Sequence, residues 1–315
     1  MDVRPKKALG QHFLTDQSIA RAIVDSLSPA PRILEVGPGM GVLTQYLLAR
    51  TASAASGCGL RSDEKVLATQ APLGSFGQPS GFGSETRPAG QASPDGKVPP
   101  CRDFLATPVA SVSHSQLKVV EIDSESVQYL LAHYPALAPG LLEADFLKLS
   151  LDKVFAEPFS IIGNFPYNIS SQIFFHILDY RDLVPEVVCM IQKEVAERLA
   201  AGPGSKTYGI LSVLLQMWYG IEYRFTVGEG AFVPPPKVKS AVIRLTRNAR
   251  TDAGCDEALL RRIVKATFGQ RRKTIRNSLR SIGISDPALP FLDARPEALS
   301  VEDFITLTRA TSERQ

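Results

Sequence analysis

Short apolar runs alternate with helical periodicity along most of the chain. The segment RILEVGPGMGVLTQYLLAR, which begins at residue 32, gives an apolar run, three glycines and then leucines at helical spacing. A second run, LKVVEID at 117–123, leads into the helical pattern SESVQYLLAHY, and a third unit carries LLEADFLKL at 141–149. Strands that alternate with helices predict an α/β fold, with a Rossmann-like, mostly parallel sheet and helices on both faces. Ligands bind such sheets beyond the carboxyl ends of the strands.

The second half of the chain continues this pattern and then changes. The stretches EVVCMIQKEVAERLAA (186–201) and GILSVLLQMWYG (209–220) are interpreted as two amphipathic helices, separated by the breaker GPGSKTYG. The segment FVPPPKVKSAVIRL (232–245) leads from a proline-stiffened loop into a strand. Beyond a soft boundary near 247–256 the pattern is helical and basic. We therefore expect a catalytic domain at 1–247 and a small helical domain at 248–315.

Residues 52–115 differ from the rest of the chain, because they are rich in Ser, Gly, Ala and Pro and lack periodicity. We interpret them as a low-complexity, disordered insertion that acts as a passive linker. Gly37 and Glu121 lie 84 positions apart, and the insertion accounts for 64 of these. The remaining 20 match the spacing between the glycine turn and the ribose-binding acid of a nucleotide-binding βαβ unit.

Composition sets the broad class. The 315 residues are 44% hydrophobic and 21% charged, which is enough material for a large core and a smaller one. No apolar run approaches the roughly 18 residues of a membrane span, and the N-terminus lacks the apolar core of a signal peptide. A cytoplasmic protein without a membrane partner is expected. The four cysteines are scattered and no histidine stands at metal-ligand spacing, so neither a disulfide framework nor a metal site is predicted.

The glycine turn favours a particular ligand class. Gly37, Gly39 and Gly41 follow a strand, so the backbone can approach a ligand closely in front of a helix N-terminus. A P-loop would need Gly-Lys-Ser/Thr, and the dinucleotide fingerprint would need glycine where Val42 stands. The sequence therefore argues against both a P-loop and a dinucleotide-binding turn.

Acidic residues at three strand ends narrow the ligand further. Glu35 precedes the glycine turn, where a carboxylate suits an ammonium or sulfonium group. Glu121 is placed to accept hydrogen bonds from ribose hydroxyls, and Asp145 could accept from the exocyclic amine of adenine. Ribose, adenine and a cationic amino-acid tail together describe S-adenosylmethionine.

The motif GNFPYNISS at 163–171 suggests the methyl acceptor. An adenine exocyclic nitrogen is a poor nucleophile until two acceptors draw its hydrogens out of the ring plane. Asn164 can supply a side-chain carbonyl and Pro166 a backbone carbonyl, and Tyr167 can stack on an extruded base. No strong general base is needed, because catalysis would consist mainly of positioning.

At this point the motifs resemble a known family. GQHFL, EVGPGMG, EID, EADF, GNFPYNIS, QKEVAERL, FVPPPKVKSAV and FGQRRKTIRNSL look like those of the ribosomal RNA adenine dimethyltransferases, and are closest to the bacterial KsgA branch. The resemblance covers nearly the whole chain apart from the insertion, which has no counterpart in the usual pattern. It implies a class I methyltransferase sheet and dimethylation of N6 of two adjacent adenines in the 3′-terminal hairpin of small-subunit (16S) rRNA.

The resemblance also implies site residues. Catalysis would use Asn164, Pro166 and Tyr167, with Phe232 closing on the other face of the target base. His12 stands where many members carry asparagine. The residues expected to contact S-adenosylmethionine are His12, Leu14, Gly37, Gly39, Glu121, Ile122, Asp145, Phe146 and Asn164.

A basic segment indicates the RNA surface. The net charge of +3 is too small by itself to indicate a nucleic-acid partner. Residues 259–280, however, carry eight basic residues and no acid. Arg272, Arg276 and Arg280 recur every four positions and would line one helical face. We expect Lys6 and Lys7 to extend this surface. The predicted RNA-binding residues are Arg271, Arg272, Lys273, Arg276 and Arg280.

The favoured partner is small-subunit rRNA in immature 30S particles, bound by a monomer, with no role for DNA. Two alternatives stay open. One is the antibiotic-resistance branch, which methylates a large-subunit adenine, and the basic QRRKTIRNSL element argues against it. The other is a catalytically silent ribosome-assembly factor, against which the intact Asn164, Pro166, Tyr167 and Glu121 argue. A DNA adenine methylase is less favoured, because no separate target-recognition domain is visible.

Overall fold

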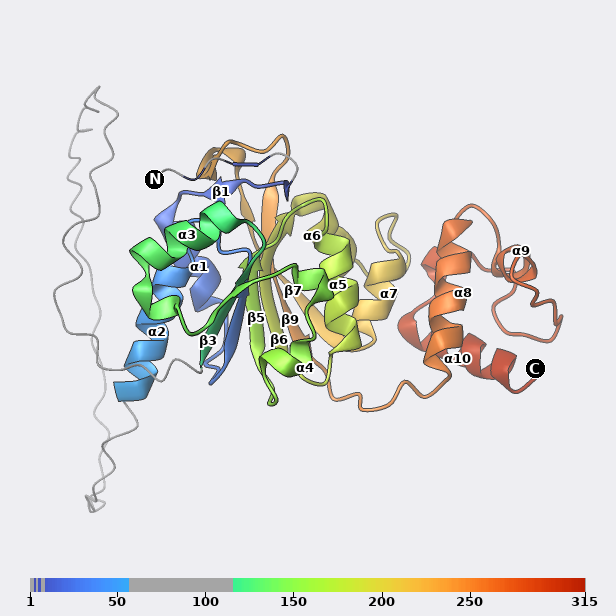
Figure 1. Ribbon diagram of the computed structural model, residues 1–315. Coiled ribbons are helices and arrows are strands. Elements are labelled where there is room, and N and C mark those ends of the chain that lie inside the picture. Colours follow the sequence, from blue (N-terminus) through green and yellow to red (C-terminus); the bar gives the residue numbers. More distant parts are fainter. Residues whose placement is uncertain (1–2, 4, 7–8, 57–115, 315) are drawn as a thin grey trace, which may run out of the picture.

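The computed structural model describes residues 3, 5–6, 9–56 and 116–314 (Figure 1). Most of the expected insertion at 52–115 therefore lies outside the described residues. Its first five residues, 52–56, instead complete helix α2 (Thr44–Ser56). The helix that follows the glycine turn thus runs past the point where the composition changes.

A seven-stranded sheet forms the centre of the molecule, in the order β4-β3-β2-β5-β6-β9-β7. The pairs from β4 to β6 are parallel, and β9 and β7 are antiparallel additions at one edge. The prediction of a mostly parallel α/β sheet is confirmed. The strands are β2 (Ile33–Val36), β3 (Leu117–Glu121), β4 (Leu141–Glu143), β5 (Ser160–Asn164), β6 (Glu186–Gln192), β7 (Tyr219–Val227) and β9 (Ser240–Arg247). A separate two-stranded ladder joins β1 (Phe13–Leu14) to β8 (Phe232–Val233).

Helices cover both faces of the sheet (Figure 1). Successive strand residues point to opposite faces, so Leu34 and Val36 enter one core while Ile33 enters the other. On the Ile33 side lie α1 (Gln17–Asp25), α2 and α3 (Ser124–His133). On the other side lie α4 (Leu151–Val154), α5 (Ser170–Asp179), α6 (Lys193–Ala200) and α7 (Ile210–Gln216), and short 3-10 turns occupy Pro135–Leu137, Phe146–Lys148, Glu229–Ala231 and Pro296–Ala298.

The prediction of a helix over 186–201 is wrong for the first half of this segment. Residues Glu186–Gln192 form the central strand β6, and only Lys193–Ala200 form a helix. An apolar run with two adjacent valines fits a strand buried on both faces, and such a run lacks the alternation that would identify it. The second expected helix, at 209–220, is also shorter, because it ends at Gln216 and β7 begins at Tyr219.

The C-terminal helices pack against the α7 side of the sheet domain (Figure 1). They are α8 (Glu257–Gly269), α9 (Ile275–Arg280) and α10 (Val301–Ser312). The ring of Phe268 lies 5.9 Å from the rings of both Tyr208 and Phe304. Arg181 also donates two hydrogen bonds of 3.0 Å to Glu257. The helical segment is thus joined to the sheet domain by a shared apolar core and a bidentate ion pair.

Replacing Gly163 should loosen the middle of the sheet. A Cβ at Gly163 would stand 2.3 Å from the carbonyl oxygen of Val36 on the neighbouring strand. Neither strand backbone can move away without strain. We expect Gly163→Ala to lower the free energy of unfolding by about 1–3 kcal/mol in urea titrations. Gly220→Ala is the matched control, since its Cβ would meet nothing nearer than 3.9 Å and should change stability little. Equal losses in both variants would contradict this account.

Candidate active site

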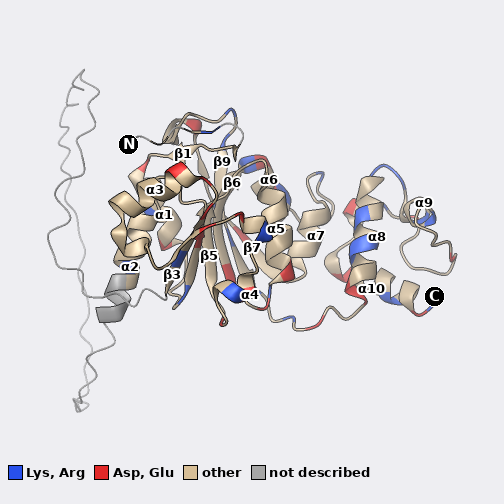
Figure 2. Ribbon diagram, viewed as in Figure 1, with Lys and Arg blue, Asp and Glu red and all other residues tan. Residues whose placement is uncertain are grey.

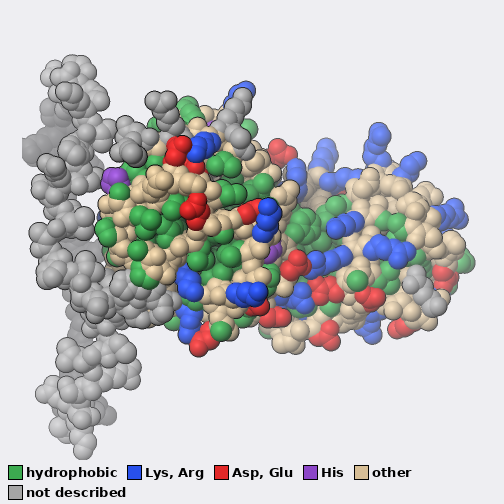
Figure 3. Space-filling model, in the orientation of Figure 1, with side chains coloured by type: hydrophobic (Ala, Val, Ile, Leu, Met, Phe, Trp, Pro, Cys, Tyr) green, Lys and Arg blue, Asp and Glu red, His purple; other side chains and the backbone are tan. Residues whose placement is uncertain are grey.

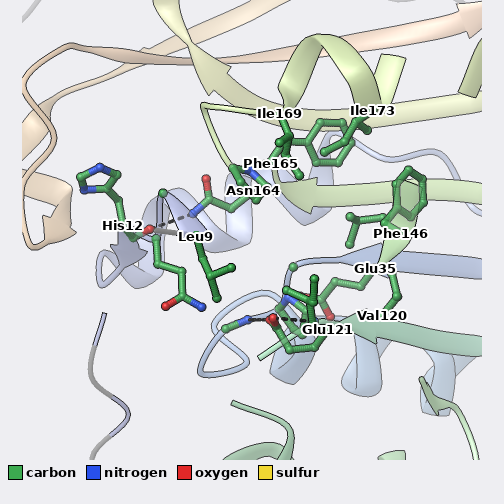
Figure 4. Close-up of a pocket in the computed structure, with 18 of the residues that line it drawn as sticks. Leu9, His12, Glu35, Val120, Glu121, Phe146, Asn164, Phe165, Ile169 and Ile173 are labelled. Atoms are coloured by element: carbon green, nitrogen blue, oxygen red, sulfur yellow. Dashed lines mark hydrogen bonds between the residues drawn. The ribbon is translucent and has the colours of Figure 1, made fainter. Parts of the chain in front are cut away.

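A cavity of about 320 Å³ opens where the strand order reverses (Figure 4). Strand β2 has β3 on one side and β5 on the other, so the chain leaves β2 in one direction and later returns on its opposite side. Open α/β sheets bind ligands at such a switch point. The walls come from the glycine turn after β2, the ends of β3 and β5, the segment after β4 and residues 9–14.

The structure brings together nearly all the residues that the sequence singled out. Those that line the cavity are His12, Leu14, Gly37, Gly39, Glu121, Ile122, Asp145, Phe146, Asn164, Pro166 and Tyr167. Phe232 does not, because it is 2% exposed and packs in the core as the strand partner of Leu14. In this conformation Phe232 does not reach the cavity.

The glycine turn is shaped by its lack of side chains. Gly37 and Gly39 have φ angles of 69° and 56°, in the left-handed region that favours glycine. A Cβ at Gly39 would come within 2.9 Å of the Phe13 ring, so the N-terminal segment lies directly on the turn. Gly37 and Gly39 therefore form a bare backbone surface facing the cavity.

Glu121 is held by backbone donors at the end of β3. Its carboxylate accepts hydrogen bonds from the N–H groups of Gly39 (3.2 Å), Ile122 (2.9 Å) and Asp123 (3.0 Å). Burial raises the pKa of Glu121, and the three N–H donors act against that rise. The carboxylate is thus fixed in orientation and faces the cavity beside the glycine turn.

Glu35 forms part of the cavity floor and is fully buried. One carboxyl oxygen accepts a 2.7 Å hydrogen bond from the hydroxyl of Thr44, and the other has no partner among the described residues. Burial, assisted by the nearby charge of Glu121, raises the pKa of Glu35 to about 8. A buried acid with an orphaned oxygen suits a cationic group, whose arrival would favour the ionised form.

The acceptor motif lies beside the glycine turn. The Asn164 Nδ2 donates a 3.0 Å hydrogen bond to the backbone oxygen of His12, which leaves Oδ1 available as an acceptor (Figure 4). The Pro166 carbonyl accepts a 3.2 Å bond from Ile169 N–H and keeps one lone pair. The Tyr167 hydroxyl is hydrogen-bonded to Ser240, and burial raises the pKa of this phenol.

Sequence analysis missed Thr44 and Ser240. Thr44 could have been found, since it opens the helix after the turn and returns to Glu35 nine residues earlier. No sequence pattern indicated Ser240, because its contact with Tyr167 spans 73 positions and depends on the tertiary fold. Asp145 was expected to bind adenine; its carboxylate accepts a 3.0 Å bond from Leu147 N–H and lines the cavity.

The basic segment is arranged differently from the expectation. Helix α9 begins at Ile275, so Arg272 lies in the preceding turn and cannot share a helical face with Arg276 and Arg280. The threonine at 274 occupies the N-cap position, which the four-residue periodicity did not reveal.

Several of the basic side chains already have partners. Arg271 donates to the Ser205 carbonyl (3.1 Å), and Arg276 pairs with Asp293 (2.9 Å). Lys6 is paired with Asp123 and Glu125, and Lys7 lies outside the described residues. Arg272, Lys273 and Arg280 are exposed. Figure 2 shows basic positions along α8 and α9, and Figure 3 shows basic side chains projecting from this part of the molecule.

The comparisons with known proteins agree with this geometry. The family model described as "Ribosomal RNA adenine dimethylase" matches residues 3–57 and 100–305. The chain belongs to this family. Membership makes it a methyltransferase of the S-adenosylmethionine-dependent type, as the strand-end residues predicted. Within the described residues no group of three or more His, Cys, Asp or Glu side chains could hold a metal ion, and no helix there is long and apolar enough to cross a membrane.

Curated relatives cover almost the whole chain. A protein from Phocaeicola vulgatus is 49% identical over 312 residues, which span 97% of this chain and 89% of the relative. One from Parabacteroides distasonis is 48% identical over 97% of this chain and 93% of its own. Both are named "Ribosomal RNA small subunit methyltransferase A".

Solved structures share the fold at lower identity. A dimethyladenosine transferase from Plasmodium falciparum aligns with a TM-score of 0.63 at 19% identity, covering 96% of this chain and 98% of its own. The 23S rRNA methyltransferase ErmE aligns with a TM-score of 0.55 at 21% identity, covering 94% and 99%. These similarities establish the fold.

Glu35 should make the cofactor-free protein less stable as pH rises. In the unfolded chain this group titrates near 4.5, and in the folded protein near 8. Between these values the folded state holds a proton that the unfolded state lacks, so the free energy of unfolding falls with increasing pH and levels off above about 8. Glu35→Gln imitates the protonated acid and should remove this contribution, which is at most about 1.4 kcal/mol per pH unit.

Urea unfolding of both proteins between pH 5 and pH 8 measures this effect. The stability of the variant relative to wild type should increase with pH. Glu313→Gln, at an exposed carboxyl, is the control and should run parallel to wild type. A constant difference between Glu35→Gln and wild type would show that Glu35 is ionised throughout.

Proposed function

We propose that the protein dimethylates N6 of two adjacent adenines in the 3′-terminal hairpin of 16S rRNA during assembly of the 30S subunit. One observation carries the proposal: the glycine turn and the Asn164–Pro166–Tyr167 motif follow neighbouring residues of paired strands and share one cavity. The names of relatives that are 45–49% identical support the small subunit as the source of the RNA.

The donor half of the cavity fits S-adenosylmethionine, which supplies an electrophilic methyl group on a sulfonium. Glu121 would accept from the ribose hydroxyls, and Asp145 from the adenine amine. Glu35 would compensate the positive charge, since one of its buried oxygens lacks a hydrogen-bond partner among the described residues and the side chain lines the cavity. Leu14, Ile122 and Phe146 would supply apolar walls, and the bare turn at Gly37 and Gly39 would admit the amino-acid tail.

The acceptor half positions the nucleophile. Asn164 Oδ1 and the free lone pair of Pro166 O would accept the two N6 hydrogens, so that the nitrogen lone pair turns toward the methyl group. Tyr167 would stack on the extruded base. The proton can leave to water after transfer, because the methylated nitrogen is acidic. Aligning the two reactants is therefore the main contribution of these residues.

The RNA surface is proposed to involve Arg271, Arg272, Lys273, Arg276 and Arg280. In our proposal residues 1–247 form the catalytic domain, 248–315 form the RNA-binding domain, and an insertion falls within 57–115, since residues 52–56 complete helix α2. The family match passes over residues 58–99, which supports the insertion. The enzyme is proposed to act as a cytoplasmic monomer on immature 30S particles.

Mapping the methylated base tests the substrate. The protein is incubated with labelled S-adenosylmethionine and either immature small subunits or large-subunit RNA, and N6,N6-dimethyladenine is located by primer extension. We expect label in the 3′-terminal hairpin of 16S rRNA. Label confined to large-subunit RNA would overturn the assignment, and cofactor binding without any label would favour a silent assembly factor.

Removing the Asn164 amide should abolish methyl transfer. We expect Asn164→Ala to lower kcat at saturating cofactor by at least about 100-fold, the usual cost of deleting one transition-state hydrogen bond. RNA affinity, measured by filter binding, should stay within about twofold. Asn248→Ala, in a loop where the backbone N–H of this residue donates to the Trp218 carbonyl, is the control. A kcat of Asn164→Ala close to that of wild type would exclude the proposed mechanism.

The exposed cations at 272 and 273 should contribute salt-dependent RNA affinity. We expect Arg272→Ala with Lys273→Ala to weaken binding to small-subunit RNA and to reduce the salt slope of log K by about 1 per residue. Arg21→Ala on α1, at the other end of the molecule, should leave the slope unchanged (Figure 1). An equal salt slope in wild type, the double variant and Arg21→Ala would contradict this prediction, because the RNA would then bind another surface.

A further inference from the structure

His12 faces the acceptor half of the site. Its ring lies against the ring of Tyr167, with centroids 5.4 Å apart and an interplanar angle of 26°. Its Nδ1 lies 2.9 Å from the carbonyl oxygen of Pro234. That oxygen can only accept, so Nδ1 carries the hydrogen. In Figure 4 the imidazole points away from Glu35 and Glu121, which lie on the donor side.

The backbone of His12 reaches the same half of the site. Its carbonyl oxygen accepts the hydrogen bond from Asn164 Nδ2 at 3.0 Å. An amide that donates through Nδ2 at this place must direct Oδ1 elsewhere, so the carbonyl of His12 selects the orientation in which Asn164 can accept from a substrate. One residue thus touches both Asn164 and Tyr167.

The chain around His12 holds it in place. Strand β1 begins at the next residue, where Phe13 pairs with Val233. Thr15 N–H then donates to the Ala231 carbonyl at 2.8 Å. The Tyr167 hydroxyl is fixed from the other end by Ser240 on β9. Tyr167 is therefore restrained at its hydroxyl by β9 and at one ring face by an imidazole that is itself tied to the proline loop.

The spacing of the two rings decides which face of Tyr167 is available. A base sandwiched between them would need about 7 Å between ring planes, or two carbon contacts of about 3.5 Å. The observed centroid separation is 5.4 Å, so no base fits between His12 and Tyr167. A target adenine that stacks on Tyr167 must therefore use the opposite face, with His12 behind the ring.

We infer that His12 is a positioning residue of the acceptor site, whose ring backs Tyr167 and whose carbonyl orients the amide of Asn164. This inference rests on the proposed adenine acceptor site. The expectation that His12 contacts the cofactor left open whether the side chain or the backbone does so, and the inference assigns the imidazole to the base. Its loss should let the Tyr167 ring tilt and misalign the nucleophile, while the donor half of the cavity stays intact.

Steady-state kinetics on immature small subunits test the consequence. We expect His12→Ala to lower kcat about tenfold or more, while the KM and the calorimetric Kd for S-adenosylmethionine stay within about twofold. His12→Phe keeps a ring behind Tyr167 and should recover most of the lost rate, which a general loss of folding would not allow. A raised cofactor Kd with unchanged kcat would make the side chain a cofactor ligand and overturn the inference.

The matched control is His133→Ala on α3. His133 also stacks on a tyrosine, Tyr129, with centroids 3.8 Å apart, but it is exposed and lies outside the cavity lining. Its removal deletes the same kind of ring pair and should leave both kcat and cofactor affinity unchanged. A rate loss equal to that of His12→Ala would attribute the effect to a general loss of stability and overturn the inference.

Fluorine NMR tests the contact without relying on turnover. The chain has eight tyrosines, so 3-fluorotyrosine labelling gives few resonances, and Tyr167→Phe identifies the one from Tyr167. That resonance should shift in His12→Ala and stay in place in His133→Ala. An unmoved resonance would refute the contact. If wild type fails to methylate small subunits yet the resonance shifts, the proposed substrate fails and the His12 contact stands.

Discussion

The parallel pairing of β2 with β5 sets Val36 opposite Gly163, and the geometry of the site depends on this register. Gly37 follows Val36 and Asn164 follows Gly163, so the donor turn and the acceptor motif begin side by side. The pairing needs glycine at 163, where a Cβ would meet the Val36 carbonyl at 2.3 Å. Methyl donor and acceptor can therefore meet without a domain movement, which fits catalysis by positioning.

Two buried acids give the cavity its electrostatic character. Glu35 is fully buried, and one of its oxygens has no hydrogen-bond partner in the part of the chain that the structure describes. Glu121 beside it accepts hydrogen bonds from three backbone N–H groups. Burial without full compensation raises the pKa of both groups, and that of Glu35 to about 8. A ligand that brings hydroxyl donors and positive charge relieves this cost. The same acids would disfavour a pyrophosphate, which explains why a nucleotide-like fold here selects a cationic cofactor.

Much of the cavity lining could be predicted from the sequence, because parallel strands end at one edge and polar residues such as Glu121, Asp145 and Asn164 stand at or just after those ends. The predictions that were wrong concern features that tertiary contacts determine. The strand Glu186–Gln192 looked helical since burial on both faces removes alternation. Arg272 lies outside α9, because this helix begins only after its N-cap residue, Thr274. The direction of the His12 ring is set by Tyr167 and Pro234, more than 150 positions away.

The central claim is that one cavity aligns a sulfonium methyl group with an adenine N6. The most direct measurement is a crystal structure of the protein with S-adenosylhomocysteine and an RNA hairpin that carries the target adenines. The ribose hydroxyls should lie on Glu121, the target N6 should lie within hydrogen-bond distance of Asn164 Oδ1 and Pro166 O, and the base should stack on the Tyr167 face opposite His12. An adenine held elsewhere, with its N6 turned away from Asn164, would contradict the claim.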